Sequence, residues 1–384
     1  MARDQDVLGI GMVGYAFMGR AHSQAWRNVA SFFELPTRPR MAAICGRDAD
    51  AVAAAAARLG WPATETDWKR LVQRDDVDLV DVCTPGSSHA EISIAALEAG
   101  KHVLCEKPLA NTVEEARAMA AAAERAAARG VRAMVGFNFR RVPAVALARE
   151  LVAAGRLGPI RHVRAAYLGA HLLDPEFPLV WRLQAAEAGS GALGDLGAHA
   201  VDLAQYLAGD RITGVSALTE TFVRERPLPG GGGARGPVTV DDAALFIARF
   251  AGGAVGAFEA TRFATGHDEG LRVELNGELG SLVWELGAFN ELRFFDATDD
   301  PATQGFRRIQ VTRSVHPYAA AWWPEGHNIG YEHTFTHEVR DLLEAIAAGR
   351  DPAPSFADGL YVQQVLDAVQ RSAAAGSAWQ EVAP

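Results

Sequence analysis

The sequence predicts an α/β protein with two parts: a doubly wound parallel sheet, then an α/β domain with a large, mainly antiparallel open sheet. Three observations carry this prediction. The chain has 384 residues, which is too long for one ordinary hydrophobic core. Up to about residue 136, short apolar runs alternate with amphipathic helical patterns, as in parallel sheets with crossover helices. Beyond that point, strand-like runs follow one another with only short glycine-containing turns, which favours antiparallel pairing.

The first part, residues 1–136, is expected to alternate strand and helix. Apolar runs predict strands over residues 7–13, 41–45, 77–84, 101–106 and 131–138. Helical periodicity predicts helices from about Met18 and over residues 48–60, 87–100 and 112–130. This regular order is typical of consecutive βαβ units.

The second part, residues 137–384, has a different pattern after an opening helix at 142–155. Strand-like runs cover residues 161–169, 244–250, 253–263, 271–277 and 280–286. A helix at 194–209 precedes most of these strands, and two more helices begin near Tyr331 and Ala357. The glycine-rich stretch 227–237 is expected to be a flexible surface loop. Residues 296–328 show few clear periods and are long enough to form a lid or an inter-subunit segment.

Bulk composition excludes several classes of function. Hydrophobic residues make up 49% of the chain and charged residues 22%, as in soluble globular proteins. The net charge of -10 argues against nucleic acid or an anionic membrane as a general partner. No apolar stretch approaches the ~18 residues that a membrane helix needs, and the N-terminus lacks the pattern of a secretory signal. Three scattered cysteines support neither a disulfide framework nor a zinc site, so we expect a cytoplasmic protein.

The stretch GYAFMG, residues 14–19, nearly matches the dinucleotide-binding fingerprint G-x-G-x-x-G. It lies between the first expected strand and the first expected helix, which is the context that the fingerprint requires. Ala16 replaces the middle glycine, so its methyl group could push the cofactor's diphosphate outward slightly. The alternative is a strand-to-helix turn without a ligand. The βαβ context favours cofactor contacts from Gly14, Ala16, Phe17, Met18 and Gly19.

The choice between NAD and NADP depends on the residue after the second strand. An acidic residue there hydrogen-bonds the adenosine ribose and favours NAD, whereas an arginine accommodates the 2′-phosphate of NADP. Gly46 occupies the expected acid position and Arg47 follows it, which favours NADP(H) slightly. In the alternative, Arg47 is merely solvated and Asp48 binds the ribose of NAD.

Two further stretches carry residues suited to hydroxyl chemistry. Lys107, in the sequence CEKPLA, ends a predicted parallel strand and should therefore face the cofactor crevice. Asp195 and His199 are four residues apart on a predicted helix, so they share a face. An imidazole titrates near ~6.5 and can accept an alcohol proton, and the acid can position it or the substrate. The alternatives are an ordinary ion pair or half of a metal site. His333 and His337 repeat this spacing, and neither pair has a third ligand at helpful spacing; we expect no metal.

Together these motifs resemble the glucose–fructose oxidoreductase / inositol dehydrogenase family, also called Gfo/Idh/MocA. The resemblance covers essentially the whole chain, through the fingerprint and the motifs CTPGSSHAEI, CEKPLA, FNFRRVPA, SGALGDLGAHAVDL and SFADGLYVQQVLDAV. Within the family, the segments GYAFMGRAHS, WRLQAAEAGSGALGD, GPVTVDD and HPY are most similar to sugar dehydrogenases. The departures from the family pattern are Ala16 and Gly46, which affect pyrophosphate geometry and cofactor choice.

The resemblance implies an N-terminal Rossmann domain, assigned here to residues 1–136, and a substrate-binding and oligomerisation domain, residues 137–384. It implies a catalytic set of Lys107, Asp195 and His199. Beside the cofactor, in addition to Gly46 and Arg47 from the residue pattern, it places Lys107 and the border residues Thr84, Pro85 and His89, with Glu106 close to the nicotinamide ribose. Candidate substrate contacts are Asn138, Arg140, Tyr167, Arg182, Asp195 and His199.

The implied activity is hydride transfer between a secondary hydroxyl of a sugar, anhydrosugar or cyclic polyol and NAD(P). His199 would take the hydroxyl proton while Lys107 stabilises the oxygen. The implied assembly is a homodimer or homotetramer. The alternatives are a keto-sugar or nucleotide-sugar reductase, with a basic groove from Arg140, Arg141 and Arg182, and a non-catalytic dinucleotide-binding regulator.

Overall fold

The computed structural model describes residues 7–383. Contacts divide the chain into two compact units. The described part of the first unit comprises residues 7–141 and 329–360, and that of the second comprises residues 142–328 and 361–383. The assignment of residues 1–136 to the cofactor and 137–384 to the substrate stays a prediction. The structure adds that residues 329–360 belong with the first unit.

The first unit contains a six-stranded sheet in the order β3-β2-β1-β4-β5-β6, with every neighbouring pair parallel. Its strands are β1 (Val7–Val13), β2 (Arg38–Cys45), β3 (Thr64–Glu65), β4 (Leu79–Val82), β5 (His102–Glu106) and β6 (Ala133–Gly136). The chain runs outward in one direction from β1 to β3 and in the other from β4 to β6. This reversal confirms the predicted doubly wound sheet, and ligands of such sheets bind at the carboxyl ends of the strands beside the reversal.

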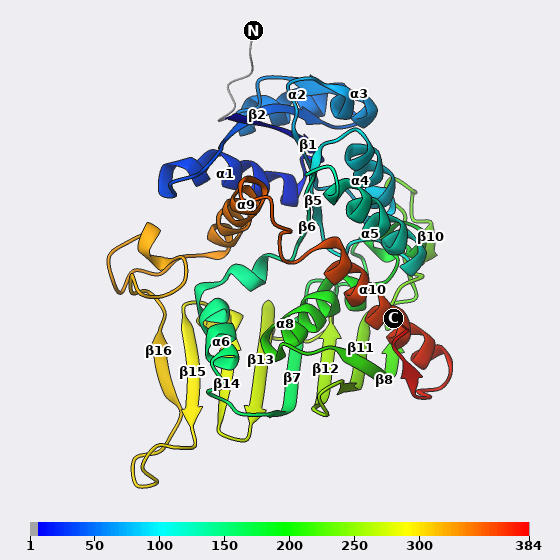
Figure 1. Cartoon of the computed structure of the whole chain (residues 1–384). Helices are drawn as coiled ribbons and strands as arrows, with labels where there is room; N and C mark the ends of the chain where they lie inside the picture. Colours follow the sequence, from blue (N-terminus) through cyan, green and yellow to red (C-terminus); the bar gives the residue numbers. More distant parts are fainter. Residues whose placement is uncertain (1–6, 384) are drawn as a thin grey trace. The chain divides into compact units, whose positions relative to one another are not determined.

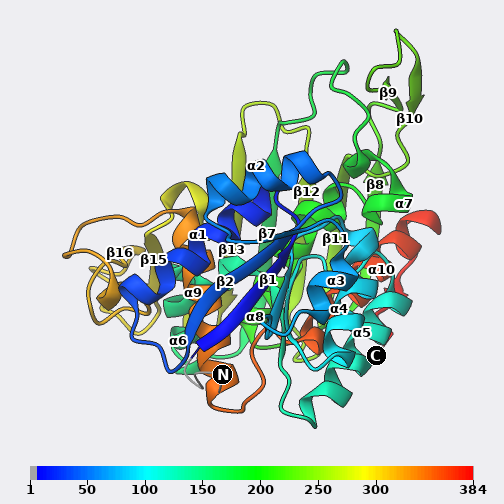
Figure 2. The same ribbon diagram turned by 90° about the horizontal axis from the view of Figure 1, so that it is seen from above.

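Helices cover both faces of this sheet (Figure 2). On one face lie α1 (Phe17–Phe32), α2 (Ala49–Leu59) and α9 (Tyr331–Ala347), and on the other α3 (Trp68–Gln73), α4 (His89–Glu98) and α5 (Val113–Ala127). Local sequence explains their ends. Asp48 caps α2 by accepting from the backbone N–H of Ala51, and Gly60 closes it in the left-handed conformation. A reciprocal capping box between Thr112 and Glu115 starts α5.

The second unit is built on a nine-stranded sheet in the order β16-β15-β14-β13-β7-β12-β11-β8-β17. The strands are β7 (Ile160–Gly169), β8 (Ile212–Glu220), β11 (Ala243–Phe250), β12 (Val255–Thr261), β13 (Glu269–Gly277), β14 (Gly280–Glu285), β15 (Glu291–Asp296), β16 (Arg307–Gln310) and β17 (Gln380–Glu381). Within the described residues, only β7 and β12 pair in parallel, and the other neighbouring strands of this sheet are antiparallel. The predicted mainly antiparallel sheet is confirmed.

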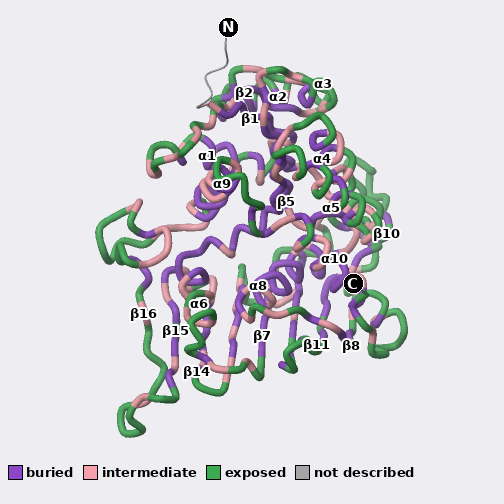
Figure 3. Tube along the Cα trace, viewed as in Figure 1, coloured by how far each residue is buried: buried purple, intermediate pink, exposed green. Residues whose placement is uncertain are grey.

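One face of the second sheet is covered and the other is open. Helices α6 (Pro143–Ala153) and α8 (Ala198–Ala208) lie over one face (Figure 1). Along β11, buried and exposed residues alternate (Figure 3), as expected where only one face is buried. The last helix, α10 (Phe356–Ala374), begins near the predicted position.

Two expected irregular stretches contain strands. The ends of the glycine-rich stretch 227–237 form a small hairpin of β9 (Glu225–Pro227) and β10 (Arg235–Pro237). The Arg235 guanidinium tethers it by donating to the backbone carbonyl of Glu225. Within residues 296–328, β16 pairs with β15. The strand prediction failed there because β16 is a short edge strand whose side chains are mostly exposed, so it has no apolar alternation.

No helix within residues 7–383 has the length and apolar character needed to span a membrane. All three cysteines are buried free thiols.

Candidate active site

In the first unit, the glycine loop of residues 14–19 has no room for a side chain at Gly14 or at Gly19. Gly14 has φ 103°, and a Cβ there would lie 2.5 Å from the carbonyl oxygen of Cys83. A Cβ on Gly19 would lie 2.2 Å from the carbonyl oxygen of Gly14. Both distances are shorter than any real contact, so the loop needs glycine at the first and third fingerprint positions.

The middle fingerprint position is open. Ala16 is exposed and forms the N-cap of α1 without a side-chain hydrogen bond to the helix. Phe17 is also exposed and Met18 is half-buried. A helix start of this kind, following a glycine turn at the end of a parallel strand, suits a phosphate group. The loop therefore fits a dinucleotide, and the contacts expected from Ala16, Phe17 and Met18 stay predictions.

Gly46 has a steric explanation. A Cβ at this position would lie 1.9 Å from the ring of Tyr15, so no acidic side chain can stand there while Tyr15 keeps its place. Arg47 is exposed. Asp48 is exposed, and its carboxylate already accepts a hydrogen bond of 2.9 Å from the N–H of Ala51.

His89 joins the loop after β4 to the loop after β5. Its Nε2 lies 2.9 Å from the carbonyl oxygen of Thr84, and its Nδ1 lies 3.0 Å from that of Pro108. Because carbonyl oxygens only accept, both nitrogens must donate, which requires the charged imidazolium. Burial lowers the pKa of His89, but Cys105 and the two carbonyls outweigh it and raise the value to about 9. Thr84 and Pro85 are half-buried beside it.

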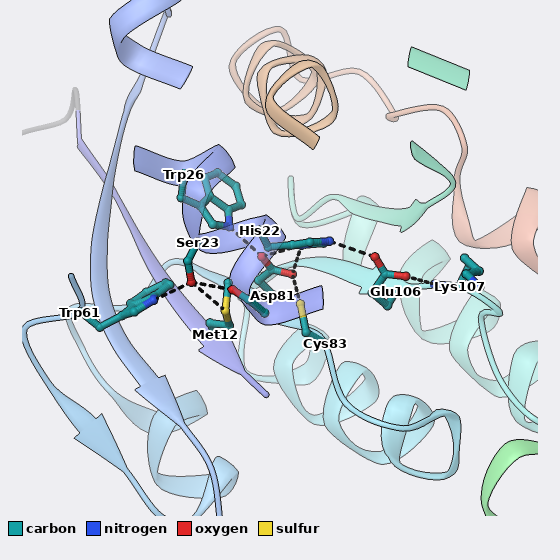
Figure 4. A network of polar contacts seen from close by, with 10 residues as sticks. Met12, His22, Ser23, Trp26, Trp61, Asp81, Cys83, Glu106 and Lys107 are labelled. Atoms are coloured by element: carbon teal, nitrogen blue, oxygen red, sulfur yellow. Dashed lines mark hydrogen bonds and ion pairs between the residues drawn. The ribbon is translucent and has the colours of Figure 1, made fainter. Parts of the chain in front are cut away.

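Glu106 and Lys107 stand at the carboxyl end of β5 in a buried hydrogen-bond network (Figure 4). One carboxylate oxygen of Glu106 lies 2.9 Å from Nε2 of His22, and the other accepts 3.0 Å from the backbone N–H of Lys107. Nδ1 of His22 lies 3.0 Å from both carboxylate oxygens of Asp81. Glu106 is therefore fixed from within the unit, and its expected contact with the nicotinamide ribose stays a prediction.

Sequence analysis missed four members of this region: His22, Asp81, Cys83 and Glu338. The first two are fully buried, and an acid inside the apolar run 77–84 is a signal that could have found Asp81. Glu338, on α9, is also fully buried, and neither carboxyl oxygen has a hydrogen-bond partner. Burial raises the pKa of Glu338 to about 8, so this carboxyl is neutral near pH 7.

His22, Asp81 and Cys83 also place one potential ligand atom each within 4.8 Å of one another, the kind of arrangement that could hold a metal ion among the described residues. Hydrogen bonding already explains their closeness, because Asp81 accepts from Trp26 Nε1 at 2.7 Å and from Cys83 Sγ at 3.4 Å. His337 lies elsewhere in the unit, buried, with Nδ1 2.8 Å from the carbonyl oxygen of Arg141.

In the second unit, Asp195 does not lie in a regular α-helix. It belongs to a π-helical turn, η4 (Leu193–Gly197), and α8 begins only at Ala198. The expected helix over 194–209 is wrong in this detail. The Asp241 carboxylate holds the start of the turn, because its two oxygens accept from the N–H groups of Gly191 at 2.7 Å and Leu193 at 2.8 Å. π turns are rare and often mark functional sites.

His199 is buried one residue into α8, and its ring centroid lies 6.0 Å from that of Tyr167 on β7. Tyr167 is also buried. The exposed guanidinium of Arg182 stacks on the ring of Trp181, 4.4 Å from its centroid. Sequence analysis missed His171, after β7. Partial burial lowers the pKa of His171, although the negative charge of Asp195 raises it. The imidazole of His171 and the candidate acid therefore interact electrostatically.

The two remaining candidates belong to the first unit. Asn138 is buried and donates to the Thr334 hydroxyl at 2.9 Å, and Arg140 is half-buried. The structure gives Asn138 a structural contact, and a substrate role for either residue stays a prediction.

Comparisons with known proteins identify the family. Residues 8–137 match the model described as "Oxidoreductase family, NAD-binding Rossmann fold", and residues 145–283 match "GFO/IDH/MocA C-terminal domain". Levoglucosan dehydrogenase from Pseudarthrobacter phenanthrenivorans is 42% identical over 98% of each chain. The chain belongs to the GFO/IDH/MocA oxidoreductase family.

Solved structures agree with this identification. An oxidoreductase domain protein from Kribbella flavida superposes with a TM-score of 0.96 at 65% identity, covering 98% of this chain and 99% of that one. Levoglucosan dehydrogenase in complex with NADH and levoglucosan superposes with a TM-score of 0.94 at 42% identity, covering 98% and 100%. The predicted family, the NAD-binding Rossmann fold and the oxidoreductase function are confirmed, and so is the resemblance to sugar dehydrogenases within the family.

Glu338 predicts a pH dependence of stability. Its pKa is about 8 in the folded protein and near 4.5 unfolded, so its contribution to stability is full below about pH 4.5 and is lost as the pH rises through 8. Glu338→Gln removes this titration. We expect its Tm to fall by several degrees less than that of wild type between pH 6 and 9, since ~1 kcal/mol shifts Tm by ~2–4 °C.

The control is Glu332→Gln, an exposed glutamate on the same helix, which should keep the pH dependence of wild type. Thermal unfolding followed by circular dichroism measures both. Equal slopes of Tm against pH in wild type and Glu338→Gln would contradict the buried neutral carboxyl.

Proposed function

We propose that this enzyme oxidises a secondary hydroxyl of an anhydrosugar or a closely related sugar with NAD⁺, and that levoglucosan is the first substrate to test. The support is the likeness over nearly the whole chain to levoglucosan dehydrogenase, whose structures include complexes with NADH alone, with L-sorbose and with levoglucosan. The single observation that carries the chemistry is the Glu106–Lys107 segment, fixed at the carboxyl end of β5, the strand next to β4 at the reversal of the sheet.

The proposed mechanism assigns one role to each candidate. Bound NAD⁺ supplies the hydride acceptor. His199 accepts the proton of the substrate hydroxyl, Lys107 donates a hydrogen bond to the same oxygen and stabilises its developing charge, and Asp195 positions a neighbouring hydroxyl or the base. The glycine loop of residues 14–19 and the loops at Thr84 and Gly46 hold the cofactor.

Removing Lys107 or His199 should separate chemistry from cofactor binding. We expect Lys107→Ala and His199→Ala each to lower kcat by ~10²-fold or more while the Kd for NADH changes little. The controls are Lys69→Ala and His162→Ala, which alter exposed residues of the same types and should leave kcat unchanged. Near-normal turnover in either catalytic variant would refute its assigned role.

The alternative functions make different demands. A nucleotide-sugar reductase needs a basic groove, but Arg141 is buried and donates to the carbonyl oxygen of Ala353, with the Asp341 carboxylate 3.3 Å from its Nε. Arg141 is therefore unsuited to bind a diphosphate. A non-catalytic regulator would show no turnover on a panel of levoglucosan, hexoses, inositol and nucleotide-linked sugars.

For the cofactor we propose NAD(H), supported by the NADH complexes of the relative. The slight preference for NADP(H) predicted from Gly46 and Arg47 rests now on Arg47 alone. We expect a higher kcat/KM for NAD⁺ than for NADP⁺, and a loss of ~10-fold with NADP⁺ alone in Arg47→Ala, because a charged hydrogen bond contributes ~1.5–3 kcal/mol. Arg58→Ala, an exposed arginine of α2, is the control. A clear preference of wild type for NADP⁺ would overturn this assignment.

For the assembly we propose a homodimer or homotetramer that covers the open face of the nine-stranded sheet. This face carries exposed apolar side chains from three adjacent strands: Leu218 is 60% exposed, Leu245 44%, Ile247 58% and Val255 40%. Leu218 and Leu245 are cross-strand partners. Contiguous apolar surface of this kind marks an interaction site. The proposed compartment is the cytoplasm, which suits three buried free thiols.

The double variant Leu245→Glu/Ile247→Glu should dissociate the assembly to monomers, because four buried charges in a two-fold interface would lack partners. Light scattering after size-exclusion chromatography measures the mass. Leu279→Glu, an exposed apolar residue at the turn between β13 and β14, should leave the mass unchanged. An unchanged mass in the double variant, or a monomeric wild type, would exclude this face as the interface.

A further inference from the structure

We propose that His22 is a positioning residue for the reaction: it ties Asp81 to Glu106 and thereby fixes the backbone from which Lys107 extends. This inference rests on the proposed role of Lys107 in catalysis. It concerns side chains of the first unit only, and it assigns a purpose to three buried polar groups that packing alone does not require.

The network crosses three elements in one line (Figure 4). His22 comes from α1, Asp81 from β4 and Glu106 from the last position of β5. Asp81 meets His22 Nδ1 at 3.0 Å, His22 Nε2 meets Glu106 at 2.9 Å, and Glu106 accepts from the N–H of Lys107 at 3.0 Å. Any rotation of Glu106 breaks the contact with His22 or the one with Lys107.

The charge state of His22 follows from its partners. Both ring nitrogens face carboxylate oxygens, which only accept, so the bound form is the imidazolium. The groups facing it are Asp81 from β4, Cys83 just after β4, Glu106 from β5, and Glu338 and Phe335 from α9. Burial lowers the pKa of His22, but Asp81 and Cys83 raise it well above its usual value.

The surroundings show why this network is unusual. The same face of α1 buries Ala25, Trp26 and Val29 against the sheet, so an apolar residue would serve packing at position 22. Burying an ion triad is costly and often no more stabilising than apolar packing. Without His22, however, one oxygen of the buried Glu106 would lack its donor, which carries a penalty of its own. The effect of this costly network is that the Glu106 carboxylate stays fixed at the backbone N–H of Lys107.

Two isosteric variants separate positioning from packing. The amide nitrogen of Gln reaches the place of Nε2 and that of Asn the place of Nδ1. His22→Gln therefore keeps the donor to Glu106, whereas His22→Asn keeps only the donor to Asp81. We expect kcat with NAD⁺ and levoglucosan to fall by less than ~10-fold in His22→Gln and by ~10²-fold in His22→Asn, with the Kd for NADH nearly unchanged in both.

The matched control is Ser23→Ala. Ser23 is the next residue of α1, equally buried, and its hydroxyl accepts from Trp61 Nε1 at 2.9 Å without touching Glu106. This variant should lower Tm and leave kcat unchanged. Equal kcat values in the Gln and Asn variants would overturn the inference, because a purely structural role does not distinguish the two ring nitrogens. This holds whether both kcat values are normal or both are reduced together with a loss of Tm like that of the control.

Lys107→Ala is assayed alongside. If it loses turnover while both His22 variants keep theirs, the inference fails and the proposed function stands. If it keeps turnover, the role of Lys107 fails and the inference falls with it. A measurement on wild type is independent of variant folding: ¹⁵N chemical shifts of the His22 ring at pH 8 should show both nitrogens protonated, and a neutral ring would overturn the inference.

Discussion

A carboxylate that accepts backbone N–H groups is the interaction on which both candidate segments depend, and it is buried at Glu106 and half-buried at Asp241. In the first unit Glu106 accepts from Lys107. In the second unit Asp241 accepts from Gly191 and Leu193. A charge removed from water is tolerated only when its hydrogen bonds are satisfied, so each segment is held in the one conformation that supplies those donors. Rigid placement of catalytic groups is what hydride transfer from a bound alcohol requires.

The two sheets create the places where these carboxylates can act. In the parallel sheet, β4 and β5 end side by side. Asp81 within β4 and Glu106 at the end of β5 therefore both contact the imidazole of His22, which comes from α1. In the second sheet, Asp241 stands just before β11, and the turn η4 packs against that strand and β12. Strand ends and the turns beside them bring most of these polar groups together, and Asp81 is the one that lies inside a strand.

Sequence reasoning succeeded where the cause is local. β1 was predicted over residues 7–13 and found at Val7–Val13, because its apolar run has sharp ends. The need for Gly14 and Gly19 was predictable from the fingerprint alone. The same reasoning missed β16, whose exposed arginines give no strand pattern, and it gave a regular helix at Asp195, because residue types do not reveal a π turn.

The ionic network escaped prediction for a different reason. His22 lies 59 residues from Asp81 and 84 residues from Glu106, and only the completed sheet brings them within hydrogen-bond distance. The one local clue is an acid inside an apolar strand, since Asp81 must find donors wherever the fold buries it. Side chains that depend on tertiary partners are the part of a site that spacing rules cannot reach, and they include His22 and Asp81, which we propose help to hold Lys107 in place.

Gly46 shows how a rule about sequence positions can fail for a physical reason. The rule takes a missing acid after β2 as a sign of NADP, and it assumes that cofactor binding alone determines the residue at that position. Here the ring of Tyr15, from the glycine loop itself, fills the space of any side chain at Gly46. The packing of Tyr15 therefore explains the glycine, and the glycine by itself does not indicate whether the ribose carries a 2′-hydroxyl or a 2′-phosphate. Asp48, the other acid within reach in sequence, is engaged as the cap of α2. We therefore expect discrimination between the cofactors to depend on Arg47 or on the ring of Tyr15, which occupies the place of the acid.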